Sequence, residues 1–174
     1  MKLLILSSNN GAGHNSAGRA IEEEARSRGM ETEMVDALSI DAPWKSRVIS
    51  EIHTRGALHA PYLFEVGNHL AERDGRREKR SGCYRANARY ADKMWLYLCE
   101  HRCDTVIATH VFPALTMTHI RRHIRRDIPA YFVATDYSCA PYVQETELDG
   151  YFIPHVALRS AFIEAGVPFS RIIP

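Results

Sequence analysis

The sequence lacks the long apolar stretch that a membrane-spanning helix requires. None of its apolar runs approaches the ~20 consecutive residues needed to cross a bilayer. The first run, residues 3–6, is also too short for the apolar region of a secretory signal peptide. These absences disfavour an integral membrane or secreted protein and predict a cytoplasmic one.

Paired cysteines and surplus charge are also missing. The four cysteines are Cys83, Cys99, Cys103 and Cys139, and because they lack paired spacing we expect reduced thiols rather than disulfides. The 22 basic and 21 acidic residues leave a formal net charge of +1, which gives no general attraction to nucleic acid. We therefore expect no nucleic-acid partner, and any electrostatic function must come from local clusters.

What the sequence does contain is an alternation of strand and helix patterns over most of its 174 residues. Continuous apolar runs are typical of buried parallel strands, and helical periodicity appears between them. The predicted strands are residues 2–7, 33–36, 104–109, 130–134, 150–153 and 171–173, and the predicted helices are residues 15–28, 113–126 and 156–165. This order favours one α/β domain with a Rossmann-like, doubly wound parallel sheet.

Residues 44–103 interrupt the alternation, because they show little strand propensity. Their pattern predicts helices at about residues 44–59, 61–73 and 84–101, with apolar side chains that include Trp95, Leu96 and Leu98. A basic cluster lies in and after a glycine-flanked loop and comprises Arg76, Arg77, Lys79, Arg80, Arg85 and Arg89. Apolar helices beside a basic loop are typical of a peripheral contact with an anionic membrane. A buried core with a solvated loop is the simpler alternative.

The turn after the first strand carries most of the functional information. Gly11, Ala12 and Gly13 lead into His14 and Asn15 at the expected start of a helix, where α/β proteins hold ligands. The third glycine of a dinucleotide fingerprint is not at its required position, which disfavours a nicotinamide enzyme. The positive end of a helix dipole favours the neutral imidazole that a general base needs. A turn-capping role for this histidine is the alternative.

Two later strand ends also carry polar residues. Thr109 and His110 follow one predicted strand, and Thr135, Asp136 and Tyr137 follow the next, so both groups fall where parallel sheets place ligands. Asp136 is suited to orient a histidine or to bind a hydroxyl. Ordinary turn chemistry is the alternative for both segments.

Metal-ligand patterns are present only in weak form. His119 and His123 have the spacing of helical metal ligands, but arginines surround them in the sequence. Cys99, His101 and Cys103 lack a second pair of ligands nearby. We predict neither a metal nor a cofactor.

Together these blocks resemble the N-terminal domain of the monogalactosyldiacylglycerol synthase and processive diacylglycerol glucosyltransferase family. The matching segments extend over essentially the whole chain and comprise residues 4–7, 11–14, 36–38, 134–137, 149–155, 165–168 and 172–174. The resemblance implies that residues 1–174 form one Rossmann-like, acceptor-side lobe of a GT-B glycosyltransferase, with a helical insert at about 44–103. It also implies that the C-terminal lobe, which binds the UDP-sugar donor, is absent from this chain.

The resemblance further implies an inverting, metal-independent sugar transfer to a diacylglycerol-type lipid. In that scheme His14 is the catalytic base and Asp136 a second catalytic residue in the cleft. The insert from Trp44 to Arg89 is in that scheme the membrane-facing part. We expect the residues at the turn and the strand ends to bind substrate, namely Gly11, Ala12, Gly13, Asn15, His110, Thr135, Tyr137 and Tyr142, the last of which stands near the place of a family tryptophan. We expect Arg76, Arg77, Lys79 and Arg80 to contact an anionic, cytoplasmic membrane surface. We expect this chain alone to be inactive, and a non-catalytic lipid-, membrane- or partner-binding module is the alternative.

Overall fold

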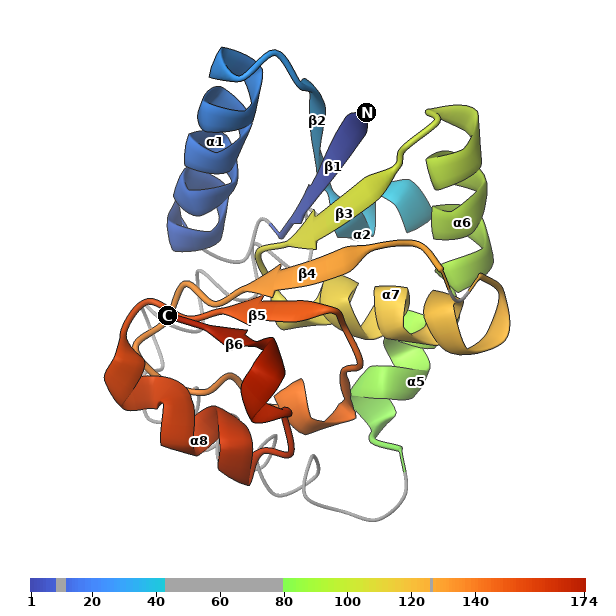
Figure 1. The fold of residues 1–174 in the computed structure, drawn as a ribbon. Helices are drawn as coiled ribbons and strands as arrows, with labels where there is room; N and C mark the ends of the chain where they lie inside the picture. The colour runs from blue at the N-terminus through green and yellow to red at the C-terminus, as the bar shows by residue number, and fades with distance from the viewer. Residues whose placement is uncertain (9–11, 43–79, 126) are drawn as a thin grey trace, which may run out of the picture.

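The computed structural model describes residues 1–8, 12–42, 80–125 and 127–174, and in them six parallel strands form one sheet (Figure 1). The strands are β1 (Lys2–Ser7), β2 (Glu31–Asp36), β3 (Thr105–Ala108), β4 (Ala130–Val133), β5 (Gly150–Phe152) and β6 (Ile172–Ile173). Their order across the sheet is β2-β1-β3-β4-β5-β6, and each neighbouring pair is parallel. The predicted α/β fold with a Rossmann-like parallel sheet is confirmed.

Helices flank this sheet and join its strands. They are α1 (Ala12–Ser27), α2 (Ala37–Asp41), α5 (Gly82–Ala88), α6 (Ala91–Glu100), α7 (Val111–His123) and α8 (Arg159–Glu164). Three short 3-10 helices are η1 (Val143–Glu145), η2 (Val156–Leu158) and η3 (Phe169–Arg171). No helix in the described ranges is both long and apolar enough to span a membrane.

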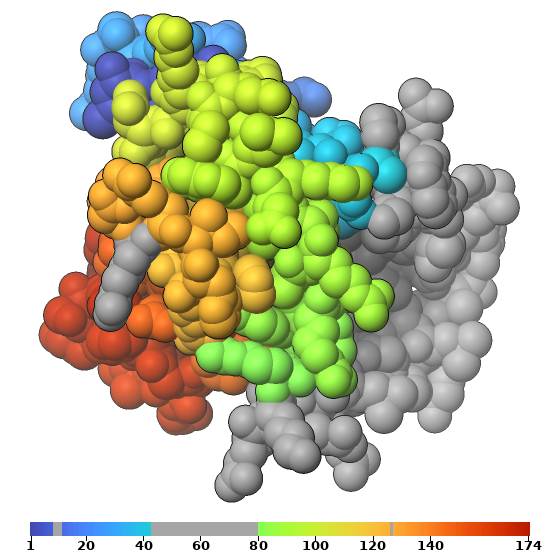
Figure 2. Space-filling model, turned by 90° about the vertical axis from the view of Figure 1, so that its right-hand side faces the viewer, coloured from blue at the N-terminus to red at the C-terminus, as the bar shows by residue number. Residues whose placement is uncertain are grey.

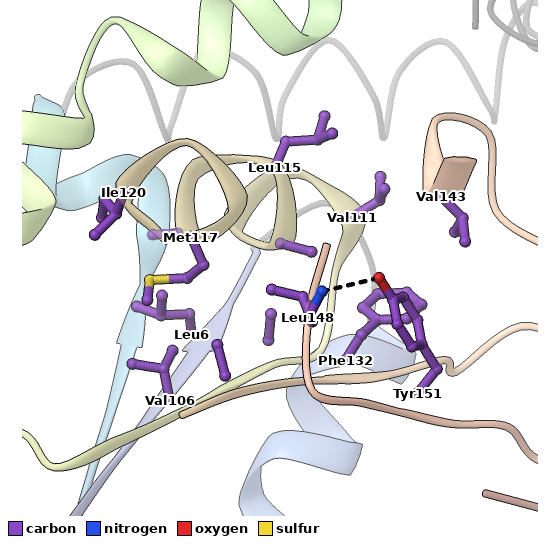
Figure 3. Packing of buried hydrophobic residues seen from close by; sticks show 14 of the residues in the cluster. Leu6, Val106, Val111, Leu115, Met117, Ile120, Phe132, Val143, Leu148 and Tyr151 are labelled. Carbon is purple, nitrogen blue, oxygen red and sulfur yellow. Dashed lines mark hydrogen bonds between the residues drawn. The ribbon is translucent and has the colours of Figure 1, made fainter. Parts of the chain in front are cut away.

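The core lies on both faces of the sheet, because successive strand side chains point to opposite sides. Leu3 and Ile5 of β1 pack against α1, where Ala25 is buried. Leu4 and Leu6 point the other way, into a larger cluster shared with α5, α6, α7 and α8. Figure 3 shows side chains of α7 above those of the strands, with the Tyr151 hydroxyl accepting a hydrogen bond from the Leu148 backbone N–H at 3.1 Å. This second cluster anchors most of the described helices.

The part of the helical insert that the structure describes belongs to this core. The single helix expected over residues 84–101 is wrong: α5 and α6 are separate, and Tyr90 between them leaves the helical conformation. Its buried hydroxyl donates to Asn87 Oδ1 at 2.9 Å, an interaction that helical periodicity does not reveal. Leu98 is buried and Trp95 packs against the core, whereas Leu96 is exposed. The helices expected at 44–59 and 61–73 lie outside the described residues.

Other helix bounds also differ from expectation, and α1 begins at Ala12 rather than at residue 15. The helix expected at residues 113–126 begins earlier, as α7 at Val111, because the His110 side chain caps its first turn. Helix α2 was not expected, although Asp36 caps it by accepting a hydrogen bond from the Leu38 N–H at 3.3 Å. Residues 156–165 form η2 followed by α8 rather than one helix.

The topology marks one edge of the sheet for ligand binding. Helix α1, which follows β1, packs on one face, whereas α7, which follows β3, packs on the other. β1 and β3 are neighbours, so their carboxyl ends form the topological switch point at which open α/β sheets hold ligands.

Candidate functional site

His14 lies on the first turn of α1, and two neighbouring strand ends hold its ring. Its Nδ1 atom is 2.8 Å from the backbone carbonyl oxygen of Thr109, which follows β3. The same Nδ1 is 2.7 Å from Oγ1 of Thr135, which follows β4. Because β3 and β4 are parallel neighbours, these two residues emerge at the same edge of the sheet. Three segments that are distant in sequence thus converge on one imidazole.

His110 flanks the ring of His14. The two ring centroids are 4.6 Å apart and the rings are nearly perpendicular, at 80°. Nδ1 of His110 accepts a hydrogen bond from the backbone N–H of Phe112 at 3.1 Å, which caps α7. One residue after His14, the Asn15 side chain accepts a hydrogen bond from Ser7 Oγ at 2.5 Å. The predicted residues His14, Asn15, His110 and Thr135 are therefore together at the switch point.

Two buried hydroxyls at this edge lack hydrogen-bond partners in the described structure. They belong to Ser8, directly after β1, and to Thr109, directly after β3. Both residues are essentially inaccessible, with exposed fractions of 1% and 0%. Leaving such a group unpaired costs about 1–3 kcal/mol, so proteins rarely tolerate it without a reason. Both hydroxyls follow the two strands that define the switch point.

The other residues expected to bind substrate surround this centre with fewer contacts. Ala12 and Gly13 are exposed, and no atom lies within 4 Å of a Cβ built at Gly13, so packing does not require glycine there. Asp136 and Tyr137 are exposed in the loop after β4, and Tyr137 has 81% of its surface accessible. Gly11 lies outside the described residues.

Asp136 does not supply the orienting contact on His14 in the described structure. That contact comes from its neighbour Thr135 and from the Thr109 carbonyl. Tyr142 is half-buried, packs against the core and has a left-handed backbone (φ 70°) just before η1. The roles expected of Asp136 and Tyr142 stay predictions.

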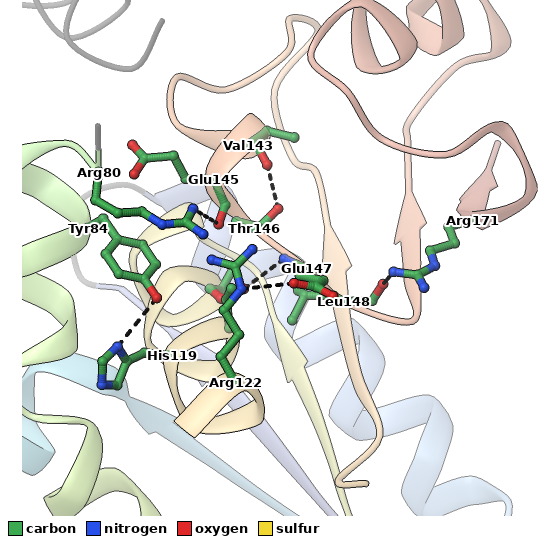
Figure 4. Close-up of polar contacts among 12 residues, drawn as sticks. Arg80, Tyr84, His119, Arg122, Val143, Glu145, Thr146, Glu147, Leu148 and Arg171 are labelled. Carbon is green, nitrogen blue, oxygen red and sulfur yellow. Dashed lines mark hydrogen bonds and ion pairs between the residues drawn. The ribbon is translucent and has the colours of Figure 1, made fainter. Parts of the chain in front are cut away.

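One member of the expected membrane-binding group has a defined position. The Arg80 guanidinium lies 4.7 Å from the centroid of the Tyr84 ring and donates to the Glu145 carbonyl oxygen at 3.4 Å (Figure 4). The buried Glu145 carboxylate also accepts a hydrogen bond from the Ser81 N–H at 3.0 Å. These contacts fix the residues that enter α5. Arg76, Arg77 and Lys79 lie outside the described residues.

Two further exposed cations follow Arg80: Arg85 lies in α5 and Arg89 directly after it. Figure 2 shows α5 and α6, in green, covering the face of the molecule next to α7. The basic cluster predicted from the sequence therefore includes three exposed arginines on or next to this helix.

The histidine pair on α7 is not arranged around a metal site. His119 Nδ1 is 3.3 Å from the Tyr84 hydroxyl, and burial together with the nearby His123 lowers the pKa of His119. In the described residues, no three His, Cys, Asp or Glu side chains are grouped to hold a metal ion.

A second polar cluster, centred on Glu33, joins the amino-terminal half of the sheet to α6. The Glu33 carboxylate is 2.8 Å from Lys2 Nζ and 2.9 Å from His101 Nδ1, and it accepts a short hydrogen bond from the Tyr97 hydroxyl. Burial alone would raise the pKa of Glu33, but these three hydrogen bonds outweigh it and hold the pKa at about 2. Burial and the contact with Glu33 raise the pKa of Tyr97. This arrangement is suited to stability rather than to proton transfer.

Comparisons with known proteins identify a family model and several relatives that the chain resembles. The sequence model of the monogalactosyldiacylglycerol (MGDG) synthase family matches residues 14–174. Processive diacylglycerol beta-glucosyltransferases from Bacillus mycoides and Bacillus cytotoxicus are each 24% identical to the chain, and that from Bacillus thuringiensis is 23% identical. Each alignment covers 99% of the chain but 43% of the relative, so the chain spans less than half the length of these proteins. No solved structure matches the chain.

Proposed function

This chain belongs to the monogalactosyldiacylglycerol synthase family, whose domain is the N-terminal lobe of a GT-B glycosyltransferase, and we propose that it is the acceptor-binding half of such an enzyme. The proposed reaction transfers a sugar from a UDP-sugar to a diacylglycerol-type lipid. The observation that carries the proposal is the position of His14 at the switch point, held by Thr109 and Thr135. The matched relatives are more than twice as long, and we assign donor binding to a part of the enzyme outside these 174 residues.

His14 acts as the general base in this proposal. The lipid hydroxyl oxygen attacks the anomeric carbon of the sugar, and Nε2 of His14 takes the hydroxyl proton. The bond between that carbon and the UDP oxygen breaks, UDP leaves with the electron pair, and the configuration at the carbon inverts. His14 later returns its proton to solvent. None of these steps requires a metal ion.

The remaining predicted residues surround the acceptor. The open space at Gly13, next to Gly11 and Ala12 in the sequence, lets a lipid headgroup approach the start of α1. Asn15, His110 and Thr135 lie at or beside the base, and Asp136, Tyr137 and Tyr142 follow β4. We assign Asp136 to the cleft beside the transferred proton and Tyr137 and Tyr142 to contacts with the acceptor.

The basic cluster brings this lobe to its substrate. Arg80, Arg85 and Arg89 are exposed, and Arg76, Arg77 and Lys79 belong to the same stretch of sequence. Each cation near an anionic bilayer contributes about 1 kcal/mol to its attraction. We therefore propose peripheral association with an anionic, cytoplasmic membrane surface.

A transfer assay tests the base assignment. The chain is joined to the remaining part of the Bacillus mycoides relative and assayed with a UDP-sugar and diacylglycerol, beside the 174-residue chain alone. His14→Ala is expected to lower kcat by about 10²–10⁴-fold, the usual contribution of general base catalysis. His123→Ala, at the far end of α7, is the matched control and keeps the wild-type rate.

The same assay contains outcomes that contradict the proposal. Unimpaired turnover by His14→Ala contradicts the role of this residue as base. Sugar transfer by the 174 residues alone contradicts the assignment of the donor site to another lobe. Lipid binding without transfer in the joined protein favours the non-catalytic module instead.

Vesicle flotation tests the membrane contact separately. Changing Arg76, Arg77, Lys79 and Arg80 to serine removes four cations, each worth about 1 kcal/mol, and is expected to weaken binding to anionic vesicles by about 10³-fold. Binding to neutral vesicles is expected to stay unaffected. The control changes Arg26, Arg28, Arg102 and Arg125, which lie at or after the carboxyl ends of α1, α6 and α7. Equal loss in both variants shows a general charge effect and contradicts a specific membrane face.

A further inference from the structure

We propose that Thr135 is a positioning residue that, together with the backbone carbonyl of Thr109, fixes the tautomer of His14. In this tautomer the proton lies on Nδ1, and Nε2 presents a lone pair to the incoming hydroxyl. The tautomer follows from the contacts of the chain itself, whereas its use in catalysis rests on the proposed function. The assignment moves Thr135 from the group expected to touch substrate to the group that acts through the base.

The Thr109 carbonyl determines where the proton lies. Its oxygen is 2.8 Å from Nδ1, a normal hydrogen-bond distance. A carbonyl oxygen has no proton to donate, so Nδ1 must donate, because two lone pairs at this distance would repel each other. A neutral imidazole carries one N–H proton, which leaves Nε2 unprotonated.

The Thr135 hydroxyl fixes the ring from a second direction. Its Oγ1 atom is 2.7 Å from the same Nδ1. Because that nitrogen already carries the proton, the hydroxyl oxygen is a second acceptor, and the Nδ1–H hydrogen bond is bifurcated. One acceptor leaves the ring free to tilt, whereas two acceptors from neighbouring strand ends define its plane. An imidazole side chain without such partners prefers its proton on Nε2, so the protein has to impose the opposite tautomer.

The same two oxygens stabilise the charged ring after proton transfer. When Nε2 has accepted the hydroxyl proton, Nδ1–H still points at two oxygens with partial negative charge. In a Ser-His-Asp triad a buried carboxylate has this orienting and stabilising role. Here the neighbouring carboxylate, Asp136, is exposed, and a carbonyl and a hydroxyl hold the ring instead.

Nitrogen NMR on the chain tests the tautomer without any activity measurement. A long-range ¹H–¹⁵N spectrum is recorded at a pH at which His14 is neutral, and its signals are assigned by their loss in His14→Gln. The expected spectrum shows a protonated Nδ1 and an unprotonated Nε2 for His14. The reverse pattern overturns the inference.

Two substitutions at residue 135 then test the contribution of the Thr135 hydroxyl to the tautomer of His14. Thr135→Val keeps the shape of the side chain, and it is expected to move part of the His14 population to the Nε2-protonated form. Thr135→Ser restores the wild-type spectrum. Thr109→Val is the matched control, because it removes a hydroxyl but keeps the carbonyl that contacts His14. An unchanged spectrum for Thr135→Val overturns the role of Thr135.

Kinetics of the joined enzyme distinguish positioning from substrate contact. Thr135→Val is expected to lower kcat by about 10–100-fold with little change in KM, since a misplaced base slows the proton transfer itself. Thr135→Ser recovers most of the rate. A raised KM with unchanged kcat assigns Thr135 to substrate binding and overturns the inference. If the spectra agree but His14→Ala remains active, the tautomer is established and the proposed function fails.

Discussion

Two polar clusters in this protein differ in how completely their groups are paired. In the Glu33 cluster one carboxylate receives hydrogen bonds from Lys2, Tyr97 and His101. At the carboxyl edge of the sheet, the hydroxyls of Ser8 and Thr109 are buried without partners in the described structure. The first cluster is saturated by the protein itself, whereas the second retains unused hydrogen-bonding capacity.

Under the proposed function, the Glu33 cluster stabilises the fold, whereas the carboxyl edge of the sheet serves the chemistry. Three donors on one carboxylate hold it in its charged form and fix α6 against β2. A group held permanently in one protonation state is unsuited to be a general base, because a base must take up and release a proton during each turnover. Near the proposed base, the hydroxyls of Ser8 and Thr109 remain unpaired in the described structure, at a cost in stability. Substitutions at the two clusters are expected to separate stability from activity.

The largest effect on stability is expected from Glu33→Gln. The change removes the charge that Lys2 and His101 contact, and we expect it to lower the free energy of unfolding by about 2 kcal/mol, since a paired, mostly buried charge is lost. Urea denaturation measures the change, with Glu23→Gln on the exposed face of α1 as the control. The joined enzyme that carries Glu33→Gln is expected to keep the wild-type turnover at urea concentrations below its unfolding transition. A loss of turnover without a loss of stability contradicts the division between the clusters.

A smaller effect is expected when pH titrates the same carboxylate. The pKa of Glu33 is about 2 in the folded protein and near 4.5 in the unfolded chain, so its contribution is complete above about pH 5. It is lost as the pH falls through the folded value, because the unfolded chain takes up the proton first. About a quarter of the side chain is exposed, which limits the effect to the order of 1 kcal/mol.

Urea titrations of the wild type and Glu33→Gln at pH 6 and pH 3 measure this dependence. The difference in stability between the two proteins is expected to narrow at the lower pH. A difference that stays constant shows that Glu33 is not the titrating group.

The smallest effect has the opposite sign and occurs at the carboxyl edge. Thr109→Val replaces a buried, unpaired hydroxyl with a methyl group of similar size, so we expect a gain of about 0.5–1 kcal/mol in the free energy of unfolding. Thermal or urea denaturation measures it, with Thr118→Val as the control, because the Thr118 hydroxyl donates to the Ala114 carbonyl at 2.8 Å. That control is expected to lose stability. A loss in Thr109→Val shows that its hydroxyl has a stabilising partner.

Local sequence patterns were sufficient to predict the parallel sheet. The apolar residues of β1 and the glycine-containing turn before α1 carry their signal within a few neighbours, and His14 lies on the first helical turn as predicted. The start of α7 was placed two residues late, because Pro113 is a strong start signal and the cap formed by His110 depends on a ring geometry. The break at Tyr90 depends on a buried hydrogen bond to Asn87 and lacks a glycine or proline that would mark it.

The contacts around His14 could be predicted only in part. Thr109 and Thr135 follow recognisable strands, so their position at the ligand-binding edge was foreseeable. That both of them contact His14 depends on strand order, because these partners are 95 and 121 residues away from it in the sequence. The carbonyl of Thr109 is a backbone group that carries no residue-type signal at all. Pairing across the sheet, rather than composition, decides the geometry of the base.

The distribution of these contacts has a consequence for how the family can diversify. His14 takes both of its Nδ1 contacts from the ends of β3 and β4, and none of these three residues belongs to the stretch between residues 43 and 79. Under the proposed function, the proton-transfer geometry is therefore a property of the sheet and of the start of α1. Relatives that keep these strand ends and this helix start are then expected to keep the orientation of the proposed base.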